Sequence, residues 1–219
     1  MNLPTERYVD QIARWPAAGQ HILAHYDDET IIVYQAYSPA IGRFAVAQGF
    51  FGGAFSLEQM SWVKPNFLWM MYRSEWGRST NQEVVLAVRL RRTFFDSLLA
   101  QAVPSSFQAA AFPDRREWEA AVQRSDVRLQ WDPDHAPSGE RCVRRAIQLG
   151  LRRSALAAYS KSELVDIIDM SEFVAEQRGN IEGGASHLLT PVERVYLPRD
   201  RSLHAHLGLA DVTAIDAGR

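Results

Sequence analysis

Apolar and polar positions alternate along some stretches of the chain with a period of two, typical of strands, and along others with a period near 3.6, typical of helices. Residues 30–37 are β-branched and aromatic and predict a strand. Ser38 and Pro39 follow as a cap residue and a proline at the first helical position, and Gly49 is a natural helix end. The first unit is therefore predicted to be strand, short turn, helix.

Three further segments alternate and predict strands: residues 83–91, 127–131 and 145–151. In the first, valines and leucines at alternate positions share one face. The Asp-Pro-Asp sequence at 132–134 is typical of a turn and should end the second strand. In the third, Gln148 stands between Ala146 and Gly150 on one face, which leaves room for another group to approach.

Helices are expected between these strands, over residues 94–102, from 114 to about 125, 154–159 and 171–178. Thr190-Pro191 also indicates a helix start. Because strands and helices interleave irregularly, we predict an α+β fold with a mixed or antiparallel central sheet and flanking helices. The whole chain, 1–219, should form one domain, with 1–20 as a lead-in and 198–219 as a mobile tail.

Composition is that of an ordinary globular protein, with 47% hydrophobic and 23% charged residues. No apolar run reaches the roughly 18 residues of a membrane helix, and the N-terminus lacks a basic start followed by an apolar core. We therefore expect no membrane partner and a cytoplasmic location. The single cysteine cannot form an internal disulfide, and no Cys/His cluster predicts a metal site.

The basic residues are unusual in kind, because all but two of the 24 are arginines. Arginine presents a planar fork of donors that suits phosphate and can stack on bases, although a coding bias would give the same composition. Arg145 is one of five arginines around one predicted strand, which an anionic ligand or a solvent-exposed edge explains equally well. Net charge is −2, so the molecule as a whole does not attract nucleic acid.

Residues 62–76, WVKPNFLWMMYRSEW, concentrate three of the six tryptophans with a tyrosine and two cations. One interpretation is a buried aromatic core, containing Phe67, Leu68, Met70 and Met71, whose polar ends reach water. The other is a ligand-binding face, because aromatic rings stack on bases or nicotinamide and cations contact phosphates. That face would consist of Lys64, Trp69, Tyr72, Arg73 and Trp76.

Motifs of common enzyme classes are missing from the sequence. It contains neither GxxxxGK[ST] nor GxGxxG, and neither GxSxG nor HExxH. Phosphate-binding loops and hydrolases of the standard kinds are therefore poorly supported.

Five blocks of the chain resemble successive blocks of the bacterial and fungal family "domain of unknown function 4291". They are DETIIVYQAYSPAIGRFA, MSWVKPNFLWMMYRSEWG, EVVLAVRLRR, VRLQWDPDH and RAIQLGL. The resemblance extends over roughly residues 14–196, and the WxKPxFLWMMYRS run is its most specific part. This resemblance does not itself imply a reaction.

The order of these blocks is more distantly similar to ADP-ribosyltransferases that modify DNA bases. That resemblance implies an ADP-ribosyltransferase-like fold in which the aromatic block covers the nicotinamide end of NAD. It places Tyr34-Gln35 at a Tyr-His pair and the Arg145–Leu149 segment at an Arg-x-x-Glu pattern, with Gln148 in place of the catalytic glutamate. Glutamine can bind ribose hydroxyls but cannot offset charge on an oxocarbenium-like transition state, so Glu75 or Glu83 would provide the carboxylate.

The leading hypothesis is therefore an NAD-dependent ADP-ribosyltransferase-like protein acting on a nucleic-acid base or nucleotide. Its expected catalytic residues are Gln148, Gln35 and Glu75. Its expected cofactor-binding residues are Tyr34, Lys64, Trp69, Tyr72, Arg73, Trp76 and Arg145. The alternative is a non-catalytic module that binds RNA or single-stranded DNA through the same aromatic and arginine face. A purely structural interaction protein is a third interpretation, which explains little about the aromatic block.

Overall fold

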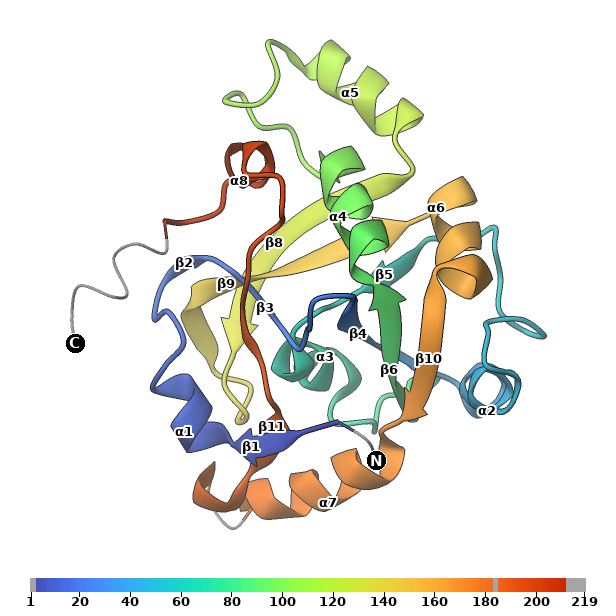
Figure 1. Cartoon of the computed structure of the whole chain (residues 1–219), viewed down its shortest axis with the longest axis vertical. Coiled ribbons are helices and arrows are strands. Elements are labelled where there is room, and N and C mark those ends of the chain that lie inside the picture. Colours follow the sequence, from blue (N-terminus) through green and yellow to red (C-terminus); the bar gives the residue numbers. More distant parts are fainter. Residues whose placement is uncertain (1–2, 183–184, 212–219) are drawn as a thin grey trace.

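Two sheets form the centre of the molecule, and a computed structural model describes residues 3–182 and 185–211 of it (Figure 1). The first sheet is antiparallel, in the order β10 (Leu164–Asp169), β6 (Val84–Arg91), β4 (Thr30–Tyr37). The second is mixed, in the order β2 (Gly19–Gln20), β9 (Arg141–Leu151), β8 (Val127–His135), β7 (Val103–Pro104), with β5 (Ser61–Val63) also paired to β9. The predicted α+β class with mixed and antiparallel sheets is confirmed.

The two sheets meet at one backbone bridge between Tyr34 and Lys64. Tyr34 lies in β4, and Lys64 directly follows β5, which pairs with β9. The Tyr34 N–H donates to the Lys64 carbonyl at 2.6 Å, and the Lys64 N–H donates back at 3.3 Å. This short segment therefore belongs to both sheets.

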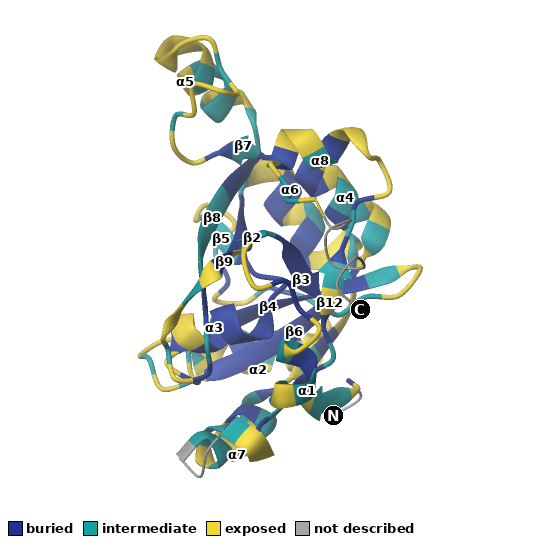
Figure 2. Ribbon diagram, turned by 90° about the vertical axis from the view of Figure 1, so that its left-hand side faces the viewer, coloured by how far each residue is buried: buried dark blue, intermediate teal, exposed yellow. Residues whose placement is uncertain are grey.

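Eight α-helices surround these sheets within the described residues. They are α1 (Tyr8–Ile12), α2 (Pro39–Gln48), α3 (Phe67–Ser74), α4 (Arg92–Gln101), α5 (Arg115–Arg124), α6 (Arg153–Ala157), α7 (Ser171–Glu182) and α8 (Ser202–Leu207). A π-helical turn (Ala158–Ser162) follows α6, and a 3-10 turn (Ala185–His187) precedes β11. In Figure 2 the central strands are mostly buried, whereas α5 extends from the top as a largely exposed arm. None of the described helices is long and apolar enough to cross a bilayer.

Strands β4 and β6 of the first sheet are buried on both faces because most of their residues are apolar, whereas the edge strand β10 is partly exposed. The predicted face of β6, from Val84 to Leu90 at alternate residues, packs into a core with α2, α4 and the second sheet. Val85 and Ala87 on the other face join a second core with α3 and α7. The predicted strand at 30–37 is confirmed, and so is the helix that ends at Gly49, whose φ is +73°.

Two short pairings bring the ends of the chain together. β1 (Thr5–Arg7) pairs with β11 (Leu189–Pro191), and β3 (Ile22–Ala24) pairs with β12 (Arg194–Tyr196). The expected helix start at Thr190-Pro191 is therefore wrong, because these residues are held in a strand by β1. The segment expected to be a lead-in packs against the rest of the fold from residue 3 onward, since Leu3 is buried and β1 pairs with β11.

Part of the segment expected to be a mobile tail forms α8. Leu203 and Leu207 of this helix are buried, and the Trp131 indole N–H donates to the Leu207 carbonyl at 3.0 Å. Residues 212–219 of the same expected tail lie outside the described residues.

Strand β8 continues through the predicted turn at 132–134. Asp132 pairs with Ala146 and Pro133 pairs with Arg145, followed by a register shift before His135. Proline cannot donate to the ladder, and a bulge accommodates it. The reversal between β8 and β9 instead lies at residues 136–140, where Gly139 adopts a φ of +87°.

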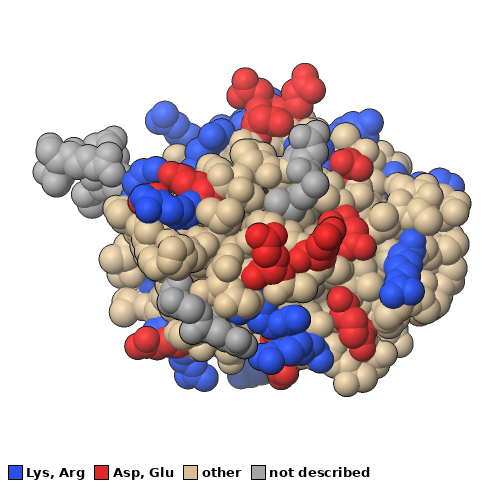
Figure 3. Space-filling view, turned by 90° about the horizontal axis from the view of Figure 1, so that it is seen from below, with Lys and Arg blue, Asp and Glu red and all other residues tan. Residues whose placement is uncertain are grey.

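The surface carries both signs of charge. Figure 3 shows one face, seen from below, on which acidic and basic side chains are interspersed, in places side by side, with uncharged areas between the groups. This distribution agrees with the net charge of −2.

Candidate functional site

Lys64 lies where the two sheets meet and is almost entirely buried, with 5% of its surface exposed. Its Nζ donates to the Trp62 carbonyl at 3.2 Å, and none of the ion pairs found among the described residues includes it. Burial and the positive charge of Arg73 lower the Lys64 pKa from 10.5 to about 7, and Asp132 acts in the opposite direction. A neutral amine is therefore accessible near neutral pH.

Two small cavities adjoin Lys64 and share Trp62. The first has a volume of about 160 Å³ and is lined also by Gln35 and Tyr37. The second has a volume of about 290 Å³ and is lined also by Arg73, Gln130 and Gln148. We call this group the Lys64 site: Gln35, Trp62, Lys64, Arg73, Gln130 and Gln148. The structure thus brings together four residues that the sequence singled out, two of them the expected catalytic amides.

Gln35 is held rigidly by its neighbours. Its Oε1 accepts from the Tyr37 hydroxyl at 2.7 Å and from the Tyr159 hydroxyl at 2.5 Å. Its Nε2 donates to the Trp62 carbonyl at 3.2 Å. Burial raises the pKa of both tyrosines, so they remain donors at all physiological pH values.

Gln148 is oriented by a carboxylate that sequence reasoning missed. Its Nε2 donates to Asp132 Oδ2 at 2.6 Å, and Gln130 donates to Asp132 Oδ1 at 2.8 Å. The three residues share one sheet face because Gln130 pairs with Gln148 and Asp132 with Ala146. Asp132 escaped notice because its Asp-Pro sequence indicated a turn; only the register of β8 against β9 places it here.

The room expected beside Gln148 is partly filled by the chain itself. Trp62 pairs with Gly150 across β5 and β9. A Cβ on Gly150 would lie 2.6 Å from the Met60 sulfur and 3.0 Å from the Trp62 ring. Glycine at this position therefore lets an indole cross the strand and form a wall of the Lys64 site.

The central part of the aromatic block forms α3, and Asn66 is its N-cap residue. The Asn66 side chain accepts from the Trp69 N–H at 2.7 Å, and the buried Glu193 carboxylate accepts from the Phe67 N–H at 2.7 Å. These contacts satisfy free N–H groups at the helix start. The four residues predicted as core, Phe67, Leu68, Met70 and Met71, are all buried, so the core interpretation is confirmed for them.

Three other aromatic residues of this block, Trp69, Tyr72 and Trp76, do not line the cavities of the Lys64 site. Tyr72 is 40% exposed, whereas Trp69 and Trp76 are buried. Tyr72 stacks on His135 at a ring-centroid distance of 3.5 Å, and Trp69 lies 5.4 Å from Tyr72 in a second stack. The ring beside Gln148 is therefore Trp62, and the expected cover of Trp69, Tyr72 and Trp76 lies elsewhere.

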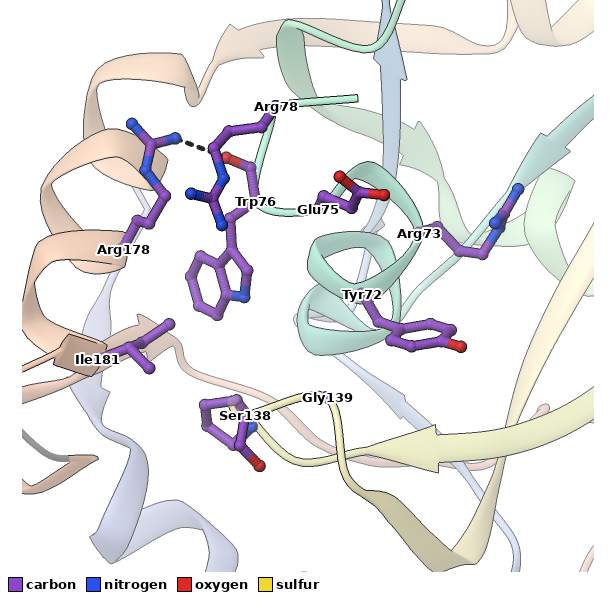
Figure 4. A pocket seen from close by; sticks show the side chains of 10 residues that line it. Tyr72, Arg73, Glu75, Trp76, Arg78, Ser138, Gly139, Arg178 and Ile181 are labelled. Atoms are coloured by element: carbon purple, nitrogen blue, oxygen red, sulfur yellow. Dashed lines mark hydrogen bonds between the residues drawn. The ribbon is translucent and has the colours of Figure 1, made fainter. Parts of the chain in front are cut away.

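A larger cavity of about 490 Å³, here the Tyr72 cavity, opens on that side of α3 (Figure 4). Its lining residues are Tyr72, Arg73, Glu75, Trp76, Arg78, Pro137, Ser138, Gly139, Arg178 and Ile181. Arg178 donates to the Trp76 carbonyl at 2.8 Å. Arg73 lines both this cavity and the Lys64 site, so α3 lies between them.

Three further expected site residues do not line the cavities of the Lys64 site, although the backbone of Tyr34 pairs with that of Lys64. Glu75 ends α3 with a φ of +51° and lines the Tyr72 cavity. Tyr34 is fully buried and packs edge-on against Phe67. Arg145 is exposed and donates to the Trp131 carbonyl at 3.0 Å; three positions from Gln148 on a strand, it belongs to the opposite sheet face.

Comparison with known proteins identifies the family but no activity. No curated protein matches the chain significantly. A family described as "Domain of unknown function (DUF4291)" matches residues 21–196, a range that includes the whole Lys64 site. Since this match extends over most of the sequence, the chain belongs to the DUF4291 family.

Proposed function

We propose that the Lys64 site binds NAD and that the protein acts as an ADP-ribosyltransferase-like enzyme on a nucleic-acid base or nucleotide. The observation that carries this proposal is the pair of uncharged amides, Gln35 and Gln148, in adjoining cavities around Lys64. Such amides suit ribose hydroxyls. Arg73 at the edge of the same site suits the diphosphate, and Trp62 offers a ring for stacking.

In this proposal Asp132 provides the carboxylate that is missing where Gln148 replaces the expected glutamate. In the proposed reaction the bond between nicotinamide nitrogen and ribose C1′ breaks, and its electron pair leaves with nicotinamide. An acceptor nitrogen or oxygen then bonds to C1′ and loses a proton. The carboxylate of Asp132, 2.6 Å from Gln148, provides negative charge near the developing oxocarbenium ion, while Gln148 Oε1 can accept from a ribose hydroxyl.

Thermal unfolding with NAD tests the binding step. A ligand that binds only the folded state stabilises it by about 2.7 kcal/mol at one hundred times its Kd. We expect NAD to raise the Tm of the wild type and of Gln101→Ala, a control at an exposed position of α4. Gln148→Ala and Gln35→Ala should lose that increase. An unchanged Tm for the wild type contradicts NAD binding.

Product analysis tests the transfer step. Incubation with NAD and DNA, RNA or mononucleotides should release nicotinamide and give a base-linked ADP-ribose adduct in mass spectrometry. Asp132→Asn should abolish the adduct and leave NAD binding largely intact. Unchanged mass of all these substrates together with no nicotinamide release contradicts the proposal.

A second candidate, a non-catalytic module for RNA or single-stranded DNA, is favoured by the Tyr72 cavity. There the partly exposed phenol ring of Tyr72 lines one cavity together with Arg73, Arg78 and Arg178. Base stacking on an aromatic side chain contributes about 1–3 kcal/mol. Tyr72→Ala should therefore weaken salt-sensitive, NAD-independent oligonucleotide binding in fluorescence anisotropy, and Val143→Ala, at a 77% exposed position, should not. Equal affinities of the two variants exclude this module.

A further inference from the structure

The two lysines of the chain have opposite environments. Lys161 is exposed and lies 4.9 Å from the centre of the Phe50 ring. Lys64 is buried between two cavities, and its Nζ donates to a backbone carbonyl instead of a carboxylate. An ammonium ion in such a place is costly unless it is paired. The site therefore favours the uncharged amine, the form that carries a nucleophilic lone pair.

The walls around Lys64 suit a polyhydroxylated, phosphorylated ligand. Side-chain amides of Gln35, Gln130 and Gln148 and the phenol of Tyr37 line the two cavities. They are hydrogen-bonding groups of the kind that match sugar hydroxyls. Arg73 is the guanidinium of the same site, and its planar donors match a phosphate.

We propose that the Lys64 Nζ forms an imine with the open-chain aldehyde of a sugar phosphate, including the terminal ribose of free ADP-ribose. The inference is independent of ADP-ribosyl transfer, because NAD itself holds its ribose C1′ in a glycosidic bond and offers no aldehyde. The chemical class of the ligand is therefore an aldose that carries a phosphate. Nothing in the step requires NAD.

The step balances without an oxidant or a reductant. The lone pair of Nζ bonds to the carbonyl carbon, and the carbonyl oxygen takes a proton to become a hydroxyl group. A second proton then leaves with that oxygen as water, and the C=N bond forms. The net change is amine plus aldehyde to imine plus water. Both protons of the released water come from the Lys64 amine, so the step needs no further proton donor.

Reductive trapping tests the bond. The full chain is incubated with ribose 5-phosphate and sodium cyanoborohydride, and the adduct is located by peptide mass mapping. We expect one reduced sugar phosphate on Lys64 in the wild type and in Lys161→Arg. Lys64→Arg keeps a cation and removes the primary amine, so this variant should lose the adduct. Adducts on Lys161 or the N-terminal amine at levels equal to Lys64, or an undiminished adduct in Lys64→Arg, overturn the proposal.

Three charged or titratable groups from different elements decide the pH dependence: Arg73 of α3, Asp132 of β8 and Tyr37 of β4. Arg73 lowers the Lys64 pKa and Asp132 raises it, whereas Tyr37 remains a neutral phenol because burial raises its pKa. Arg73→Gln should therefore move the midpoint of Lys64 reactivity to higher pH. Asp132→Asn should move it to lower pH.

Competitive labelling with acetic anhydride measures these midpoints, with Lys161 as the internal reference. A pKa near 7 instead of 10.5 raises the neutral fraction at pH 7 roughly a thousandfold, and we expect a wild-type midpoint close to neutral. A midpoint above pH 9 overturns the inference. Trapping of ribose 5-phosphate without nicotinamide release from NAD would support the imine and contradict the transferase. Nicotinamide release without a trapped adduct on Lys64 would support the transferase and contradict the imine.

Discussion

At the scale of single residues, burial of the Lys64 amine between the two sheets lowers the stability of the folded state. Its pKa falls from 10.5 to about 7 on folding, so the folded state holds fewer protons than the unfolded state between these values. The free energy of unfolding therefore rises with pH across this window. Below pH 7 the Lys64 amine is protonated in both the folded and the unfolded state. The folded state then bears the full free-energy cost of burying this charge.

Lys64→Met should reveal this cost. We expect the variant to be more stable than the wild type at pH 6, by up to about 5 kcal/mol, since a pKa difference of one unit corresponds to about 1.4 kcal/mol. The difference should shrink as the pH rises to 9, because the wild-type lysine is then neutral when folded. Urea unfolding of both proteins at several pH values measures the difference, and a gap independent of pH would show that Lys64 is not titrating.

At the scale of elements, close packing of α2 on β6 depends on a glycine. An added Cβ on Gly42 would lie 2.5 Å from the Val84 side chain, whereas one on the exposed Gly179 of α7 would have no neighbour within 4 Å. Both glycines are helical, so their intrinsic helix propensities are alike. A comparison of alanine substitutions at Gly42 and Gly179 therefore isolates the effect of packing on stability.

Gly42→Ala should destabilise the protein by about 1–3 kcal/mol, because an overpacked interface must shift. Gly179→Ala should stabilise it by about 0.5–1 kcal/mol, since alanine is the better helix former. Urea unfolding of the two variants gives both values. Destabilisation by Gly179→Ala, or tolerance of Gly42→Ala, would contradict the packing described for these helices.

Helices and strands with a clear hydrophobic periodicity could be predicted from the sequence. Short strands that form only by pairing with a strand far away in the sequence could not. The strands at 30–37 and 83–91 follow from local patterns. The three-residue β1 and β11 carry no such pattern and exist because they pair with each other. The same limit applies to the site: Lys64 and Gln148 could be selected by residue type, but the contribution of Asp132 depends on the register of β8 against β9.

At the scale of the whole molecule, the N-terminal segment is fastened to the second sheet by a buried ion pair. Arg144 of β9 donates twice to Asp134 Oδ2, at 2.8 and 2.5 Å. It also donates to the Pro16 carbonyl at 2.7 Å and lies 5.3 Å from the centre of the Trp15 ring. One guanidinium thus connects β8, β9 and the segment after α1.

Asp134→Ala should destabilise the protein by about 3–5 kcal/mol, because it leaves Arg144 charged and buried without its partner. Asp10→Ala breaks the exposed pair with Arg7 and should change stability by no more than about 1 kcal/mol. Denaturant unfolding followed by tryptophan fluorescence compares them. Similar losses in the two variants would contradict a structural role for the buried pair.

The double variant Asp134→Ala/Arg144→Met shows whether the loss in Asp134→Ala comes from leaving the buried Arg144 charge unpaired. Replacing both partners removes the unpaired buried charge, so the loss should be smaller than in Asp134→Ala alone, although the Pro16 carbonyl then loses its donor. A typical domain is stable by only about 5–15 kcal/mol, so this recovery is large enough to measure. A double variant as unstable as the single one would mean that Arg144 stabilises the molecule through Trp15 and Pro16 more than through Asp134.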